Sequence, residues 1–170
     1  IILVLEISLT PQMIERFKGR FGKEVSVFHS KLSDGERYDE WYRVKEGKAK
    51  VVVGARSGLF LPVQNLGLII IDEEHENTYK SEQNPKYVTK EVAEFITEIN
   101  DCKVILGSAT PSIETYYRAI CGEIELVELN NRIDNKPMPK IEIVDMREEL
   151  NKGNISMFSN KLFVEMREAL

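Results

Sequence analysis

The chain has little cysteine, no stretch long enough to cross a membrane and no excess of basic residues. Its 170 residues include only Cys102 and Cys121, and neither belongs to a Cys-x-x-Cys pair. This scarcity argues against a disulfide framework or a zinc ribbon. No apolar run approaches the roughly 20 residues of a membrane span, and the amino terminus lacks the basic-then-apolar layout of a signal peptide. We therefore expect a cytoplasmic protein that does not contact a membrane.

The charge balance is acidic, with a net charge of −5. Proteins that coat nucleic acid without selection rest on a basic surface, so this balance argues against that class. It is compatible with a domain that grips a few phosphates through backbone N–H groups, hydroxyls and helix N-termini. With 42% hydrophobic residues the chain can bury a core, and its length requires no more than one domain.

The sequence begins with an apolar run, Ile1 to Leu5, and has no initiator methionine. Natural chains seldom open in the middle of a strand. We therefore expect this sequence to be a piece of a longer protein.

Strand and helix patterns alternate along the chain. Short apolar runs predict strands at 1–5, 24–29, 51–53, 68–71, 104–106, 124–129 and 141–144. Helical spacing predicts helices at 10–21, 33–45, 89–99, 112–120 and 159–170. Strands separated by helices imply parallel pairing, so the expected fold is a doubly wound α/β domain.

The most informative motif follows the buried strand 68–71. It is the tetrad Asp72-Glu73-Glu74-His75, placed where open α/β sheets gather their ligand chemistry. Carboxylates at such a position can hold Mg²⁺ and orient an attacking water, as in nucleoside triphosphatases. The plain alternative is a strand followed by an acidic helix start, which the helix dipole favours. The run Gly107-Ser108-Ala109-Thr110 after a second apolar strand favours the functional interpretation.

In content and order, four motifs of this chain resemble those of superfamily 2 DNA helicases. They are Leu5–Gln12, Gly54–Ser57, Asp72–His75 and Gly107–Thr110. Four further stretches resemble the replication-restart helicases in particular: His29–Arg37, the stretch that follows the tetrad, Thr110–Tyr117 and Met138–Arg147. Together these matches cover nearly the whole chain, and a string of matches in one order is far more specific than any single motif. The resemblance implies a RecA-like domain of an ATP-dependent 3′-to-5′ DNA helicase.

The resemblance assigns roles around the tetrad. Asp72 would bind Mg²⁺, and Glu73 would polarise the water that attacks the γ-phosphate of ATP. His75 would hydrogen-bond toward the coupling motif Ser108-Ala109-Thr110 and so link the nucleotide site to the DNA site, although a merely structural role for this histidine competes. Glu74 occupies the variable third position of such motifs and receives no role.

The resemblance also implies DNA contacts on one edge of the domain. Thr10, Pro11, Arg56 and Ser57 match positions on that edge. Thr10 is equally explained as a helix N-cap. Arg56 has no evident packing duty in the sequence and suits phosphate recognition.

A second DNA contact is expected in the stretch 79–87, where Tyr79, Lys80 and Tyr87 stand after the tetrad. In the family an aromatic-rich loop at this place couples single-stranded DNA to hydrolysis, and two tyrosines among lysines can stack on bases and meet phosphates. The chain departs from the family pattern at Val88 and Lys90, where histidine and arginine are expected. A plain solvated loop is the alternative.

The chain contains no G-x-x-x-x-G-K-[ST] phosphate loop, which normally grips the β- and γ-phosphates. The resemblance places that loop upstream of Ile1, and a zinc-binding cysteine cluster and a second motor domain beyond Leu170. We therefore expect 1–129 to be a partial ATP-binding domain and 130–170 a connector. This piece alone is expected to be inactive.

The partners implied are single-stranded and forked DNA, together with primosome and single-strand-binding proteins. Two alternatives stay open. One is another superfamily 2 translocase, such as a branch-migration helicase or a restriction motor subunit. The other is a non-catalytic module that uses a helicase-like fold only for binding.

Overall fold

A computed structural model of the chain describes residues 1–5, 11–130 and 139–169. The chain divides into two compact units, Ile1–Leu126 and Val127–Leu170. Among the described residues, no helix is both long enough and apolar enough to span a bilayer.

The described part of the first unit alternates strands with helices in chain order. Its strands are β1 (Ile2–Leu3), β2 (Val25–Phe28), β3 (Val51–Gly54), β4 (Leu68–Asp72) and β5 (Lys103–Gly107). Its α-helices are α1 (Pro11–Phe21), α2 (Asp34–Lys45), α3 (Thr89–Ile99) and α4 (Ile113–Ile120), and its 3₁₀ helices are η2 (Gly22–Glu24), η3 (Arg56–Phe60) and η4 (Asn77–Tyr79).

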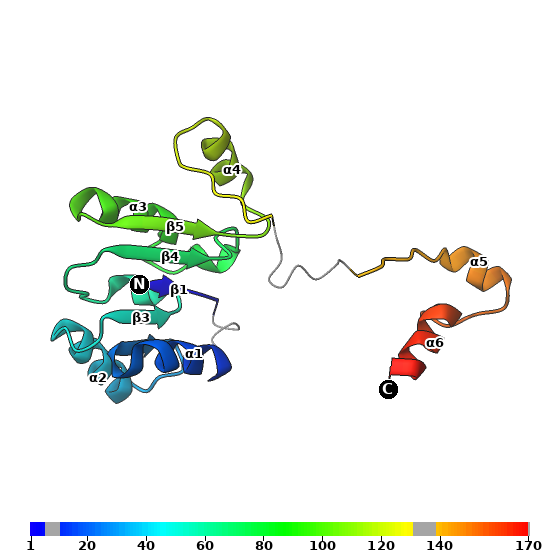
Figure 1. Ribbon diagram of the computed structural model, residues 1–170, viewed down its shortest axis with the longest axis horizontal. Helices are drawn as coiled ribbons and strands as arrows, with labels where there is room; N and C mark the ends of the chain where they lie inside the picture. Colours follow the sequence, from blue (N-terminus) through cyan, green and yellow to red (C-terminus); the bar gives the residue numbers. More distant parts are fainter. Residues whose placement is uncertain (6–10, 131–138, 170) are drawn as a thin grey trace. The chain divides into compact units, whose positions relative to one another are not determined.

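The strands form one sheet in the order β2-β3-β1-β4-β5, and every neighbouring pair is parallel. Figure 1 shows all the labelled arrowheads at the same edge of the sheet. A parallel sheet with helices between its strands is the RecA-like, doubly wound α/β architecture, so this prediction is confirmed. Because the strands run the same way, the residues that follow them meet at one edge.

The two faces of the sheet bury different side chains, as the period of two along each strand requires. On one face Leu3, Val52 and Ile71 pack with Val44 of α2 and Ala93 of α3. On the other face Val4, Val25 and Val53 are buried, with Met13 and Phe17 of α1 packed against them. Helices therefore cover both faces, and the sheet is held as a rigid platform.

Local capping signals set several helix starts. Ser33 caps α2 in a complete capping box, because its side chain accepts from the Glu36 N–H and the Glu36 carboxylate accepts from the Ser33 N–H. Ser112 caps α4 by accepting from the Thr115 N–H. Pro11 is the first residue of α1, the position at which a missing N–H costs nothing.

Two predicted strands are wrong. Residues 124–129 and 141–144 have no strand structure, and Leu129, Ile141 and Ile143 are exposed. A strand needs a hydrogen-bonded neighbour, and no described segment pairs with either stretch. Apolar character alone therefore misled the prediction.

The described part of the second unit contains two helices, α5 (Met146–Asn151) and α6 (Asn160–Ala169). The final helix was predicted from its spacing, whereas α5 was not. Glu149 joins them, since its carboxylate accepts from the Asn160 N–H at 2.7 Å and from the Asn154 amide at 2.9 Å. These hydrogen bonds lower the pKa of the Glu149 carboxyl.

Gly54 is a position where the fold requires the absence of a side chain. A Cβ there would lie 2.3 Å from the carbonyl oxygen of Phe28 on the neighbouring strand. That oxygen is backbone and cannot move aside without shifting β2. The glycine therefore permits the close approach of β2 and β3 where the carboxyl edge begins.

We predict that Gly54→Ala lowers the free energy of unfolding by ~1–3 kcal/mol, the usual cost of overpacking a tight site. Urea denaturation measures this. Gly35→Ala is the matched control, because a Cβ at that position of α2 meets nothing within 4 Å, and alanine favours a helix. Equal stability of the two variants would contradict the assignment.

Candidate functional site

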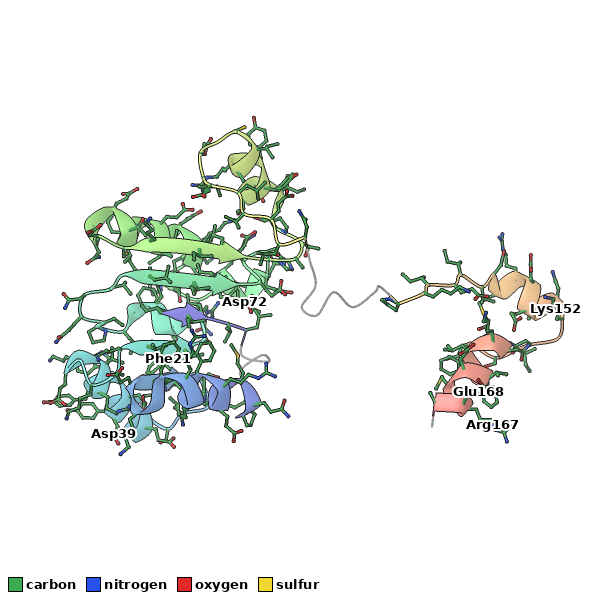
Figure 2. The ribbon with its side chains drawn as sticks, in the orientation of Figure 1. Phe21, Asp39, Asp72, Lys152, Arg167 and Glu168 are labelled. Atoms are coloured by element: carbon green, nitrogen blue, oxygen red, sulfur yellow. The ribbon has the colours of Figure 1, made fainter. Side chains whose placement is uncertain are left out.

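The tetrad and the coupling motif meet because β4 and β5 are paired in register. Asp72 lies opposite Gly107, the last residues of the two strands. Figure 2 shows Asp72 at the carboxyl end of β4. The residues that follow, 73–75 and 108–110, therefore leave the sheet side by side.

Asp72 and Glu73 present carboxylates at this edge. The Asp72 side chain is exposed and has no hydrogen-bond partner among the described residues. The backbone of Glu73 has φ of 50°, in the left-handed region that residues other than glycine rarely adopt. Such a conformation costs of order 1–3 kcal/mol, and residues held in it are enriched at functional sites.

His75 bridges to the coupling motif, as predicted. Its Nδ1 lies 2.7 Å from the Ser108 hydroxyl, and its Nε2 lies 3.5 Å from the Thr110 hydroxyl. The Ser108 hydroxyl also accepts from the Thr110 N–H at 3.0 Å, which closes a tight turn around Ala109. The predicted contact is confirmed, and the bond to Ser108 is its shorter arm.

Carboxylates flank the same imidazole on both sides. Glu73 Oε2 lies 3.5 Å from Nδ1, and Glu76 Oε1 lies 3.8 Å from Nε2. The Glu73 carboxylate therefore lies beside the imidazole nitrogen that contacts Ser108.

Glu74 is the residue that sequence reasoning missed. Its side chain is only 1% exposed and accepts from the Ser112 N–H, the Ser112 and Thr115 hydroxyls and the Lys90 ammonium. Burial raises the pKa of the Glu74 carboxyl, but the hydrogen bond from Ser112 and the charge of Lys90 outweigh burial and leave the pKa below its usual value. The sequence signal was weak, since a third acidic residue in a row reads as solvated.

Tyr79 does not face DNA, and its predicted role in stacking on bases is wrong. It is 4% exposed, and its hydroxyl donates to the carbonyl oxygens of Leu3 at 3.2 Å and Asp72 at 2.8 Å. Burial and the nearby Asp72, Glu73 and Glu76 charges raise the pKa of this phenol, so it stays a donor. The Tyr79 hydroxyl thus links the carboxyl ends of β1 and β4.

Arg56 has a structural duty that its sequence position did not reveal. Its Nη1 donates to the carbonyl oxygens of Thr78 at 3.0 Å and Lys80 at 2.8 Å. The Thr89 hydroxyl donates to the Tyr79 carbonyl at 2.7 Å. Arg56 and Thr89 thus fix the start of the 80–88 loop to the domain.

The 80–88 loop is closed at its neck by backbone contacts. Lys80 forms an antiparallel bridge with Val88, and the Ser81 N–H donates to the Tyr87 carbonyl at 2.8 Å. The Tyr87 ring packs edge-on against Phe60, with ring centroids 5.1 Å apart. Phe60 is 56% exposed and Tyr87 is half-buried, so this aromatic pair is partly open to solvent, unlike Tyr79.

The other described residues that were predicted to face DNA lie on the surface. Lys80, Ser57 and Pro11 are exposed, with Ser57 in η3 and Pro11 at the start of α1. Thr10 lies outside the described residues.

The carboxyl edge offers a magnesium ion few protein ligands. Among the described residues there is no group of three or more His, Cys, Asp or Glu side chains that could hold a metal. Mg²⁺ in nucleotide enzymes is usually held by one or two carboxylates together with substrate phosphates and waters. The accessible Asp72 carboxylate fits that mode, whereas a cage made of protein ligands alone does not fit.

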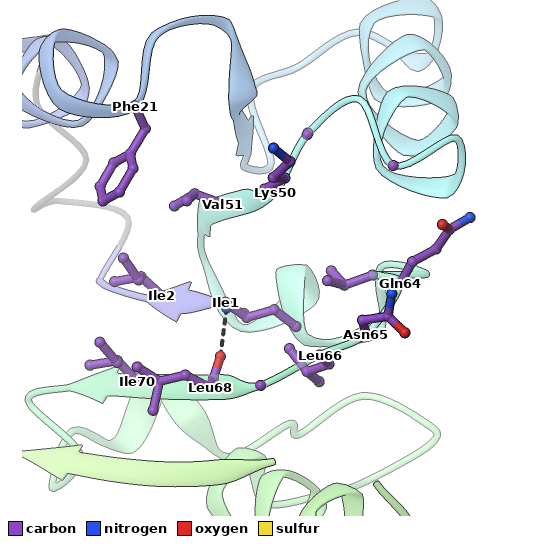
Figure 3. A pocket seen from close by; sticks show the side chains of 14 residues that line it. Ile1, Ile2, Phe21, Lys50, Val51, Gln64, Asn65, Leu66, Leu68 and Ile70 are labelled. Atoms are coloured by element: carbon purple, nitrogen blue, oxygen red, sulfur yellow. Dashed lines mark hydrogen bonds between the residues drawn. The ribbon is translucent and has the colours of Figure 1, made fainter. Parts of the chain in front are cut away.

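Two cavities lie at opposite ends of the sheet. One of about 610 Å³ lies at the carboxyl edge and is lined by Val4, Leu5, Ser30, Ala55, Arg56, Glu76, Thr78 and Tyr79. Another of about 530 Å³ lies where β3 and β4 begin; Figure 3 shows Ile1, Phe21, Leu66 and Ile70 around it, with the Ile1 amine donating to the Leu68 carbonyl. A third cavity, of about 570 Å³, has Glu74 and His75 of the tetrad in its lining, together with Lys90, Ser112 and Thr115.

Comparison with known proteins agrees with this geometry. Residues 1–119 match the DEAD/DEAH box helicase family. The chain belongs to this family. It is 55% identical to the replication restart protein PriA of Bacillus subtilis over 100% of the chain and 21% of that protein. It is 44% identical to the protein of that name from Synechocystis sp., over 99% of the chain and 21% of the relative.

A third relative extends the same pattern. The replication restart protein PriA of Chlamydia trachomatis serovar D is 41% identical over 99% of the chain and 22% of its own length. The chain thus spans about a fifth of the length of these relatives.

For this helicase chain we predict that Tyr79→Phe lowers the free energy of unfolding by ~1–3 kcal/mol, because buried carbonyl oxygens lose their donor. Chemical denaturation measures the loss. Tyr87→Phe is the control, since the Tyr87 hydroxyl has no hydrogen-bond partner in the described part of the chain. A Tyr79→Phe protein as stable as the control would mean that the hydroxyl contributes nothing.

Proposed function

We propose that the intact protein is an ATP-dependent 3′-to-5′ DNA helicase that acts in replication restart, and that this chain is part of its first motor domain. The observation that carries the proposal is the hydrogen bond of 2.7 Å between His75 and Ser108. It joins a pair of carboxylates suited to hydrolysis to a loop suited to transmitting movement. The names of the relatives support the cellular role.

In this proposal each residue of the tetrad has a separate task. Asp72 would hold Mg²⁺ through its exposed carboxylate, and Glu73 would orient the attacking water and accept its proton. When bound with ATP, Mg²⁺ neutralises charge on the phosphate oxygens. His75 would report the state of the Glu73 carboxylate to Ser108, which lies on the loop toward α4.

DNA would be met at the same carboxyl edge. Ser57, Lys80 and the partly open ring pair of Tyr87 and Phe60 are the residues available to phosphates and bases. Arg56 would act mainly by holding the loop that carries Lys80. Single-stranded and forked DNA are the proposed substrates, and primosome and single-strand-binding proteins the proposed partners.

Residues 1–129 would form part of the ATP-binding domain, and 130–170 would lead toward the second motor domain. The grip on ATP phosphates and any zinc site would come from other parts of the intact protein.

The decisive experiment is Glu73→Gln in the intact protein. Because only the water-orienting carboxylate is lost, we expect DNA-stimulated phosphate release to fall by ~10²–10⁴-fold while ATP affinity stays within about twofold. Glu91→Gln, an exposed change on α3, is the control. A parallel fall in ATP affinity would assign Glu73 to ground-state binding, and wild-type protein without DNA-stimulated hydrolysis would reject the proposed function.

A double-mutant cycle tests the bridge. His75→Ala and Ser108→Ala should each lower unwinding per ATP hydrolysed and leave ATP binding intact. The double variant should lose no more than the more severe single variant, since either change breaks the same bond. Unwinding rate and phosphate release are measured on one forked substrate. Strictly additive losses would mean that the two side chains act separately.

A further inference from the structure

Glu74 lies between Glu73 and His75 in the sequence, but its side chain is almost fully buried. Its side chain is 1% exposed. A buried carboxylate is costly unless charge and hydrogen bonds compensate it. The groups that donate hydrogen bonds to this carboxylate therefore indicate its role.

The Glu74 carboxylate is fully engaged by donors from two other elements. Oε1 accepts from the Ser112 N–H at 2.7 Å. Oε2 accepts from the Thr115 hydroxyl at 3.1 Å and the Ser112 hydroxyl at 3.3 Å. Lys90 of α3 approaches Oε2 at 3.3 Å and also donates to both hydroxyls, at 3.1 Å and 3.0 Å.

The backbone of Glu74 makes a second attachment. Its N–H donates to the Gly107 carbonyl at 3.0 Å. Gly107 and Ser112 are the two ends of the segment that carries the coupling motif. One residue therefore grips both ends of segment 107–112, by its N–H at the first and by its carboxylate at the last.

We propose that Glu74 is a positioning residue of the helicase reaction, which clamps segment 107–112 onto the end of β4. The clamp keeps Ser108 within reach of His75. It also anchors the chain directly after Glu73 and so maintains the turned backbone at that residue. This inference rests on the proposed function.

The rival explanation is a buried ion pair that merely stabilises the domain. Geometry separates the two. A stabilising pair needs only Lys90, whereas three of the four donors to Glu74 come from Ser112 and Thr115. Most hydrogen bonds of this carboxylate therefore join it to the loop and helix that follow the coupling motif.

The first test uses Glu74→Gln in the intact protein. Glutamine keeps the shape, but its amide nitrogen faces donors instead of accepting from them. We expect kcat for DNA-stimulated ATP hydrolysis to fall by ~10–100-fold, the effect typical of residues that orient catalytic groups. KM for ATP should stay within about twofold. Hydrogen exchange measured by mass spectrometry should rise in peptides covering 107–112 and not in α2.

Three further variants define the mechanism. Thr115→Val removes one donor with little change of shape and should lower kcat a few-fold even if Glu74→Gln folds poorly. Lys90→Arg keeps the charge and should retain kcat, whereas Lys90→Met should not. Glu98→Gln is the control, because Glu98 is exposed on the same helix as Lys90.

The outcomes separate this inference from the proposed function. Unchanged kcat and unchanged exchange at 107–112 in Glu74→Gln, with an active wild type, would overturn the clamp. A fall in kcat that follows only the folded fraction, judged by thermal melts, would return Glu74 to the stabilising role. An inactive wild type would reject the proposed function, while the exchange measurement would still decide whether Glu74 holds the segment.

Discussion

The parallel pairing of β4 with β5 is the constraint on which the site depends. It sets Asp72 opposite Gly107, and all later contacts between the two loops follow from that register. If the pairing register of β4 shifted by one residue, every side chain of β4 would move to the opposite face of the sheet. The buried Ile69 and Ile71 then could not remain in the core, so the hydrophobic packing enforces the chemistry.

Above this sheet edge, hydrogen bonds replace apolar packing as the source of order. Tyr79 holds the ends of β1 and β4 from below, Glu74 holds the segment after β5 from within, and Arg56 holds the loop after η4. Each uses a side chain to satisfy backbone groups that have left the regular ladder. These hydrogen bonds order the irregular loops without a cover of apolar residues. The edge of the sheet therefore stays accessible to polar ligands.

The sequence predicted the strands of the sheet, the principal helices and the contact of His75 with Ser108, because those features depend on local patterns or on strand order. Buried apolar runs and capping residues act over a few positions, and parallel strands necessarily bring their ends together. The duties of Glu74, Tyr79 and Arg56 depend on partners that are distant in sequence, such as Ser112 for Glu74. No local pattern distinguishes a buried carboxylate from a solvated one, so these assignments required the structure. The same limit explains the false strands at 124–129 and 141–144, where apolar residues have no neighbour to pair with.

The left-handed backbone at Glu73 has an evolutionary consequence. Glycine or asparagine adopts φ of 50° more easily than glutamate does, so the residue that best suits the backbone differs from the one that the proposed mechanism requires. Selection for thermal stability alone, as in a directed-evolution screen that scores only folded protein, would drift toward glycine at this position and erase the carboxylate. Under the proposed function, retention of glutamate at this position in a set of descendants would indicate selection on turnover.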